Sequence, residues 1–321
     1  MQLSIICKTV VVSMFLFTGS TVVLAAVGNT ADGIAEISFS SYRSHDKTFS
    51  QNRNVSTWQT ISASTRAMFQ ASEIRLGDDQ AGQYGDLQKF ATGFRVSGLK
   101  TNTSLWLDQY QSGYSFTGYR FDSRYAADEQ TSIVLAVAKS PVIDLDTLGE
   151  QGRPLLTSNS YSLKTERILD ANKDLSVGMT RGLYSDANKS TAYTWQYGQT
   201  IYDRGRDRLR IGAYGYKGSW DTVSQWYGNP LSSKSFGLTT TYGARDGNGR
   251  WTTTFTGAWG ADDNNPLEFW PSLRLQYQYQ ASPSSSMTFG FASGLRTDKA
   301  NELEGLRHNY RQFNAAYQAN W

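Results

Sequence analysis

The chain has 321 residues and a formal net charge of +3, a balance too small to indicate a nucleic-acid-binding surface. Hydrophobic residues make up 39% and charged residues 18%, both below the usual globular share, whereas aromatic residues reach 13%. The single cysteine, Cys7, lies near the N-terminus. The rest of the chain therefore excludes a disulfide scaffold, a thiolate metal site and a thiol nucleophile.

The first 25 residues predict a cleaved secretory signal peptide. Lys8 is the only charge, an apolar run extends from Thr9 to Phe17, and Val23 and Ala25 suit the small-residue rule of signal peptidase. We expect residues 1–25 to be removed and residues 26–321 to form the mature domain. After residue 26 no apolar stretch reaches the length of about 18 residues that a transmembrane helix needs. A membrane protein without such a helix has to be a closed barrel.

Alternation of apolar and polar residues predicts a series of strands. In the segment 272–281, Leu273 and Leu275 lie on one face, and Arg274, Gln276 and Gln278 lie on the other. Aromatic residues cluster towards the segment ends, where a membrane barrel has its aromatic girdles. A soluble sandwich would use more Val, Ile and Leu in its core, so we favour a membrane barrel. The segments with the clearest alternation are 190–201, 206–217, 249–259, 272–281 and 287–296.

Short turn signals and longer polar links separate the strands, as in barrels with periplasmic turns and extracellular loops. We count about fifteen candidate strands, least certainly at residues 45–60, and single-chain bacterial barrels close with an even number. The prediction is an all-β protein, a closed antiparallel transmembrane β-barrel of about 16 strands, with 14 as the alternative. The short turns are expected at 170–173, 186–189, 246–249 and 282–285, and the longer links at 77–86, 141–158, 218–232, 260–268 and 297–308.

The last segment, residues 307–321, resembles the C-terminal strand of Gram-negative outer-membrane barrels. Phe313, Tyr317 and Trp321 fall on one face, and the chain ends in an aromatic residue, although Trp replaces the usual Phe. The resemblance implies recognition by the barrel-assembly machinery and a place in the outer membrane, in contact with its lipid and lipopolysaccharide.

The polar face of the predicted strands is expected to line a pore. Its arginines would repel one another unless carboxylates or an anionic solute balance them. They therefore either attract anions or pair with acidic side chains of the wall. The tyrosines on this face, with Tyr184 and Trp106, either stack on sugars or simply fill the wall. The expected pore-lining residues are Arg208, Arg210, Tyr214, Tyr216, Arg250, Arg274, Gln276, Gln278 and Arg296.

One stretch resembles the C-terminal barrel domains of exopolysaccharide exporters, those for cellulose and poly-N-acetylglucosamine. It comprises Trp226 to Pro230, then Phe236 to Tyr242, then Gly249 to Trp251 and Gly257 to Gly260. The resemblance implies an export pore for a polysaccharide. Those exporters carry helical repeats before the barrel, and this sequence has none. Any periplasmic scaffold is therefore expected to be a separate protein, together with inner-membrane partners.

Two other classes of function stay open beside the export pore. A small-solute or anion-preferring porin would need an acidic inward loop, for which the link 141–158 offers Asp144, Asp146 and Glu150. A plugged surface receptor or an outer-membrane hydrolase is the further alternative. Only His45 and His308 could act as imidazole bases, and no metal-ligand cluster or phosphate-binding glycine loop occurs. We therefore expect no enzyme, no catalytic residue, no metal and no cofactor.

Overall fold

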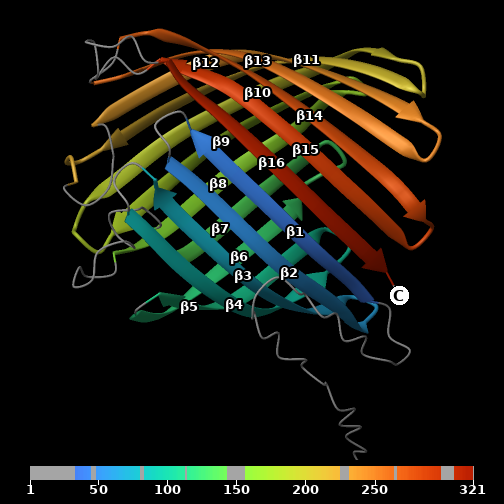
Figure 1. Cartoon of the computed structure of the whole chain (residues 1–321). Helices are drawn as coiled ribbons and strands as arrows, with labels where there is room; N and C mark the ends of the chain where they lie inside the picture. Colours follow the sequence, from blue (N-terminus) through green and yellow to red (C-terminus); the bar gives the residue numbers. More distant parts are fainter. Residues whose placement is uncertain are drawn as a thin grey trace, which may run out of the picture.

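The computed structural model describes residues 33–44, 48–79, 83–112, 114–142, 156–224, 231–263, 266–297 and 307–320. These residues form a closed antiparallel β-barrel of 16 strands, as predicted (Figure 1). The strands are β1 Gly33–Ser44, β2 Thr48–Ser62, β3 Thr65–Asp78, β4 Gln83–Ser97, β5 Thr101–Ser112, β6 Tyr114–Ala126, β7 Thr131–Pro141, β8 Thr157–Asp170, β9 Lys173–Tyr184, β10 Lys189–Asp203, β11 Asp207–Trp220, β12 Ser232–Asp246, β13 Gly249–Asp262, β14 Glu268–Ser282, β15 Ser285–Thr297 and β16 Arg307–Asn320. In this part of the chain no helix is long and apolar enough to span a membrane. The expected signal peptide lies outside the described residues.

Every strand pairs with its neighbours in the sequence, and β1 closes the ring by pairing with β16. The closing register runs from Ile34 opposite Asn320 to Ser44 opposite Tyr310. Because the ring is closed, no strand of the barrel has an unpaired edge. The segment 45–60, where the predicted strand pattern is weakest, contains most of β2.

The connections differ at the two ends of the barrel. One end, the short-turn end, carries the brief connections that follow the even-numbered strands, for example residues 247–248 between β12 and β13. The other, the long-link end, carries the longer connections, for example residues 221–231 between β11 and β12. The sequence pattern predicts short turns at one end of the barrel and longer links at the other. The turn at 186–189 departs from this arrangement. It follows β9, which runs in the same direction as β1, so this short turn lies at the long-link end.

The register separates an outer and an inner face of the wall, because directly opposed residues of paired strands point to the same side. Leu105 and Phe94 lie opposite each other and are 54% and 56% exposed, which marks the outer, lipid-type face. Trp106 and Asp108 alternate with these residues and are buried on the inner face. A buried apolar cluster of the inner wall joins Met68, Ala91 and Trp106, with Trp58 packed against them.

A carboxylate ties two of the connections together at the long-link end. Asp263 accepts hydrogen bonds from the backbone N–H groups of Leu231 (3.1 Å) and Ser232 (3.0 Å). These bonds, led by the one from Ser232, hold the pKa of Asp263 below its ordinary value. A lowered pKa means that the contact stabilises the folded state above the ordinary pKa of aspartate, about 4, and that this contribution is lost as the pH falls through the lowered pKa.

We therefore expect Asp263→Asn to loosen the 231–232 segment at neutral pH. Hydrogen exchange should show weaker protection of the Leu231 and Ser232 amides in the variant. The protection in the wild-type protein should fall towards that of the variant as the solution becomes acidic. Asp246→Asn, which changes a carboxylate at the short-turn end, is the control and should leave both amides unchanged. Equal protection in wild type and Asp263→Asn would contradict the assignment.

Candidate functional site: the polar inner wall

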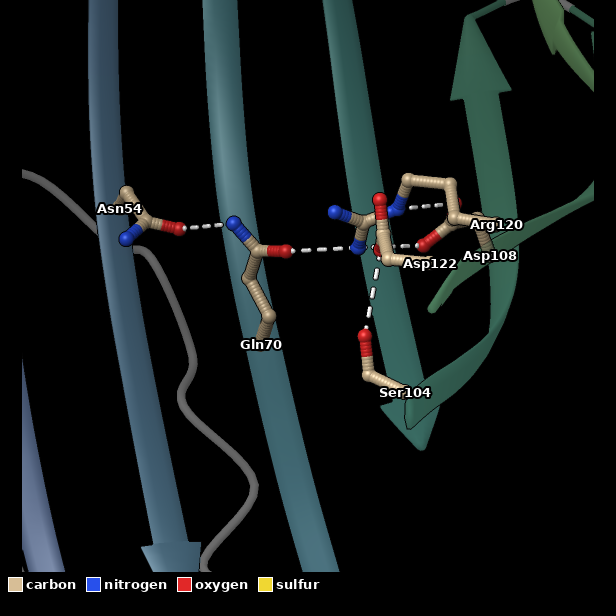
Figure 2. Close-up of polar contacts among 6 residues, drawn as sticks. All are labelled: Asn54, Gln70, Ser104, Asp108, Arg120 and Asp122. Atoms are coloured by element: carbon tan, nitrogen blue, oxygen red, sulfur yellow. Dashed lines mark hydrogen bonds and ion pairs between the residues drawn. The ribbon is translucent and has the colours of Figure 1, made fainter. Parts of the chain in front are cut away.

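A network of polar side chains crosses the inner wall from β2 to β6 (Figure 2). Arg120 donates two hydrogen bonds to the carboxylate of Asp108, at 2.7 and 2.9 Å, and a third to Gln70 at 3.0 Å. Gln70 in turn donates to Asn54 at 2.7 Å. Asp108 is 0% exposed, so its charge is balanced entirely by the wall. The guanidinium of Arg120 also covers the ring of Trp106, at 4.8 Å from the centroid.

A second arginine is balanced in the same way across β10. Arg210 on β11 donates to Asp174 on β9 at 2.5 Å. The side chain passes over Gly198 of the intervening strand, where a Cβ atom would collide with the guanidinium. The glycine therefore keeps open the path by which Arg210 reaches its carboxylate. Arg208, two residues earlier, donates to Thr200 at 2.9 Å and lies 3.8 Å from Asp203.

The arginines near the short-turn end line a hollow in the inner wall. The hollow has a volume of about 310 Å³ and is lined by Arg208, Arg210 and Arg250, with Thr241, Gly243 and Thr252 between them. Gly243 and the two threonines are small, which leaves the three guanidinium groups bordering open space. Among the described residues, no carboxylate forms an ion pair with Arg250.

Two pairs of arginines face each other directly on neighbouring strands at the short-turn end. Arg66 on β3 is opposite Arg95 on β4, and Arg245 on β12 is opposite Arg250 on β13. We call these four residues the mouth arginines. None of them has an ion-pair partner in the described part of the chain, although Arg95 covers the ring of Trp58 at 5.5 Å. Like charges directly opposed on a sheet are destabilising, so this arrangement favours an anion between them.

The two pairs lie on nearly opposite sides of the ring, since seven strands separate them one way and five the other. Each pair adjoins a hollow: the one at Arg250 already described, and one of about 390 Å³ lined by Trp58 and Arg66 among others. A solute at this end of the lumen therefore meets positive charge from both sides. Sequence reasoning identified Arg250 but missed Arg66, Arg95 and Arg245, because nothing in the sequence tells which arginines become neighbours across strands.

The remaining residues expected to line a pore have the following positions. Arg274, Gln276 and Gln278 share the inner face of β14, where Gln278 lies directly opposite Arg250. Arg296 lies in β15 opposite His308, and its side chain is outside the described set. On β16, Phe313 and Tyr317 lie together on the outer face, with exposures of 46% and 37%. Trp321 and the acidic link residues Asp144, Asp146 and Glu150 lie outside the described residues.

The inner tyrosines of β11 lie close to glycines of the wall. The Tyr214 ring covers Gly237, which is directly opposite on β12, where an added Cβ would come within 2.6 Å of the ring. Tyr216 covers Gly218 of its own strand in the same way. Nearer the long-link end, the rings of Tyr184 and Trp220 approach to 4.8 Å between centroids. A ring lying against a glycine can leave its other face towards the lumen. Trp106 differs, because Arg120 covers its ring.

An unbalanced acid lies at the opposite end of the inner wall. Glu268, the first residue of β14, is directly opposite Gly260 and is only 7% exposed. Neither of its carboxylate oxygens has a hydrogen-bond partner among the described residues. In the described wall, four arginines without a carboxylate partner thus lie at the short-turn end, and a buried carboxylate without a described partner lies at the long-link end.

Within the described residues, no group of three or more His, Cys, Asp or Glu side chains could hold a metal ion. His45 lies outside this part of the chain, and His308 is described only as a backbone position in β16.

No protein-family model matches the chain, and comparison with curated proteins finds no match in sequence. Solved structures do match. A bacterial polysaccharide outer membrane secretin aligns with a TM-score of 0.71 at 11% identity, over 89% of this chain and 98% of that one. CdiB from Acinetobacter baumannii aligns with a TM-score of 0.55 at 9% identity, over 88% of this chain and 60% of that one. At these identities the likeness shows the fold alone: this chain has the β-barrel fold of Gram-negative outer-membrane proteins.

Proposed function

We propose that the protein is an outer-membrane channel for polar solutes with a preference for anions, and that its cargo is an exopolysaccharide leaving the periplasm. The observation that carries the proposal is the set of mouth arginines, which lack carboxylate partners in the described wall and face the lumen from two sides. The short-turn end, where they lie, is the periplasmic end in barrels of this kind. An acidic polymer would therefore meet positive charge on entry.

Two further observations support a sugar chain as the cargo. Tyr214 and Tyr216 lie along the wall over glycines, a position from which ring faces can make weak, sliding contacts with sugar C–H surfaces. The barrel also aligns over almost its whole length with that of a polysaccharide secretin. Movement would be passive, and its direction would come from separate periplasmic or inner-membrane partners. The contacts of Arg120 and Arg210 with carboxylates hold those side chains against the wall and give them a structural role.

The test is single-channel conductance of the refolded protein in a planar bilayer, with oligosaccharides of increasing length added to one side. We expect steady, anion-preferring conductance that long acidic oligosaccharides block more strongly from the short-turn side than neutral chains of equal length. Block by short anionic solutes alone would replace the export proposal with an anion-preferring porin. A barrel that folds but does not conduct would contradict the channel itself and favour the plugged receptor or the hydrolase.

A further inference from the structure

Two lysines face each other on the outer surface of the barrel. Lys217 on β11 is directly opposite Lys234 on β12, and both side chains are exposed. They belong to the outer face, since Phe236 and Leu238 continue that face along β12 with exposures of 50% and 60%. In the described part of the chain, neither lysine has a carboxylate partner. The pair is therefore a site of positive charge without a described counter-charge, next to the apolar Phe236 and Leu238 of the same face.

The neighbouring aromatic residues fix the depth of this pair in a membrane. Tyr193 lies directly opposite Lys217 on the other side and is 53% exposed. Phe236, two residues from Lys234, stacks on Trp259 at 5.3 Å between centroids. Outward aromatic residues of a barrel mark the boundary between hydrocarbon and headgroups. The two ammonium groups lie at that boundary or just beyond it, towards the long-link end.

Three outward arginines of β1 to β3 near the same end have carboxylate partners. Arg43 lies 2.7 Å from Asp79, Arg53 lies 3.6 Å from Glu73, and Arg75 lies 3.6 Å from Asp86. The wall thus supplies counter-charges to these three arginines, whereas no described carboxylate pairs with Lys217 or Lys234. Arg181 on β9 and Lys189 on β10 are also outward and exposed, opposite Thr191 and Leu183, and neither pairs with a described carboxylate.

We propose that Lys217 and Lys234, assisted by Arg181, bind the phosphate groups of the glycolipid that forms the outer leaflet of the outer membrane. The phosphate groups of this glycolipid, at headgroup level, supply the anion that the opposed lysines require. The acyl chains of the same glycolipid pack against the apolar surface formed by Phe236 and Leu238. A free phosphate ion offers the charge without those chains. The inference rests on the proposed membrane location and is independent of which solute the barrel passes.

The experiment compares the full chain refolded into phosphatidylcholine vesicles with and without bisphosphorylated lipid A, in the presence of a chelator of divalent cations. The midpoint of thermal unfolding is followed by the shift in electrophoretic mobility between folded and unfolded barrel. We expect lipid A to raise this midpoint for the wild type and for the charge-preserving K217R/K234R variant. K217Q/K234Q should lose at least half of the rise.

Three outcomes would overturn the proposal. K217Q/K234Q retaining the full rise would show that the lysines do not hold the lipid. An equal rise with dephosphorylated lipid A would show that phosphate is not the recognised group. An equal rise with inorganic phosphate in vesicles of phosphatidylcholine alone would make the site a general anion site. If the double variant fails to fold, the single variant K234Q, which changes one exposed side chain, replaces it in the same comparison. Conductance measured on the same vesicles tests the channel separately.

Discussion

Replacing Arg245 and Arg250 together with serine is expected to lower the preference of the channel for anions by at least about threefold at low salt. The reason is electrostatic: a unit charge about 7 Å from a passing ion contributes about 0.6 kcal/mol even in water, which is about one RT. Two charges act together here, and no ion pair with a described carboxylate weakens them. The measurement is the reversal potential across a bilayer with a potassium chloride gradient.

The control for this experiment makes the same change in net charge on the other face of the wall. Arg53 and Arg75 lie on the outer face, where Glu73 and Asp86 pair with them. Replacing both with serine should leave the reversal potential unchanged, because the lumen does not contact them. High salt should also diminish the effect of R245S/R250S, since the Debye length falls to about 3 Å at 1 M. An unaltered reversal potential in R245S/R250S would show that Arg245 and Arg250 do not act on the ions that pass through the lumen.

Asp108→Ala is expected to destabilise the folded barrel by about 3 kcal/mol, the lower end of the range for breaking a buried ion pair. Asp108 is fully buried and receives two hydrogen bonds from Arg120. Among the described residues, its loss leaves Gln70 as the one hydrogen-bond acceptor of the guanidinium. Urea unfolding of the barrel in lipid vesicles measures the change, provided that refolding traces the same curve.

Asp122→Ala is the matched comparison, because this carboxylate is on the same inner face and is exposed. It accepts a single hydrogen bond from Ser104 at 3.1 Å, and its removal should change the free energy of unfolding by no more than about 0.5 kcal/mol. The double variant D108L/R120M removes both charges and should recover much of the stability lost in Asp108→Ala. Equal effects of Asp108→Ala and Asp122→Ala would mean that the Arg120 contacts contribute little.

The barrel itself could be predicted from the sequence because its strongest signal is local. Alternation in segments such as 272–281 reports which residues share a face, and the structure confirms that Arg274, Gln276 and Gln278 do. The signal was weak at 45–60 because Arg53 on the outer face of β2 pairs with Glu73, so polar residues occur on both faces there.

The assembly of the inner wall could not be predicted from the sequence. The opposition of Arg245 to Arg250 depends on the register of a hairpin, and Arg66 was not distinguishable from any other polar residue near a turn. The contact of Arg210 with Asp174 spans two strands and requires the gap at Gly198. Such contacts depend on the geometry of the closed ring, which alternation alone does not specify.

The pairing of β1 with β16 has a consequence for how the chain is ordered along the ring. Ile34 lies directly opposite Asn320, so the two ends of the barrel segment meet within one strand spacing. All other neighbours in the ring are already neighbours in the chain. The order of the strands around the ring would therefore be the same if the chain began at another strand. The wall has no structurally privileged beginning, and the differences around it come from the side chains and connections that it carries.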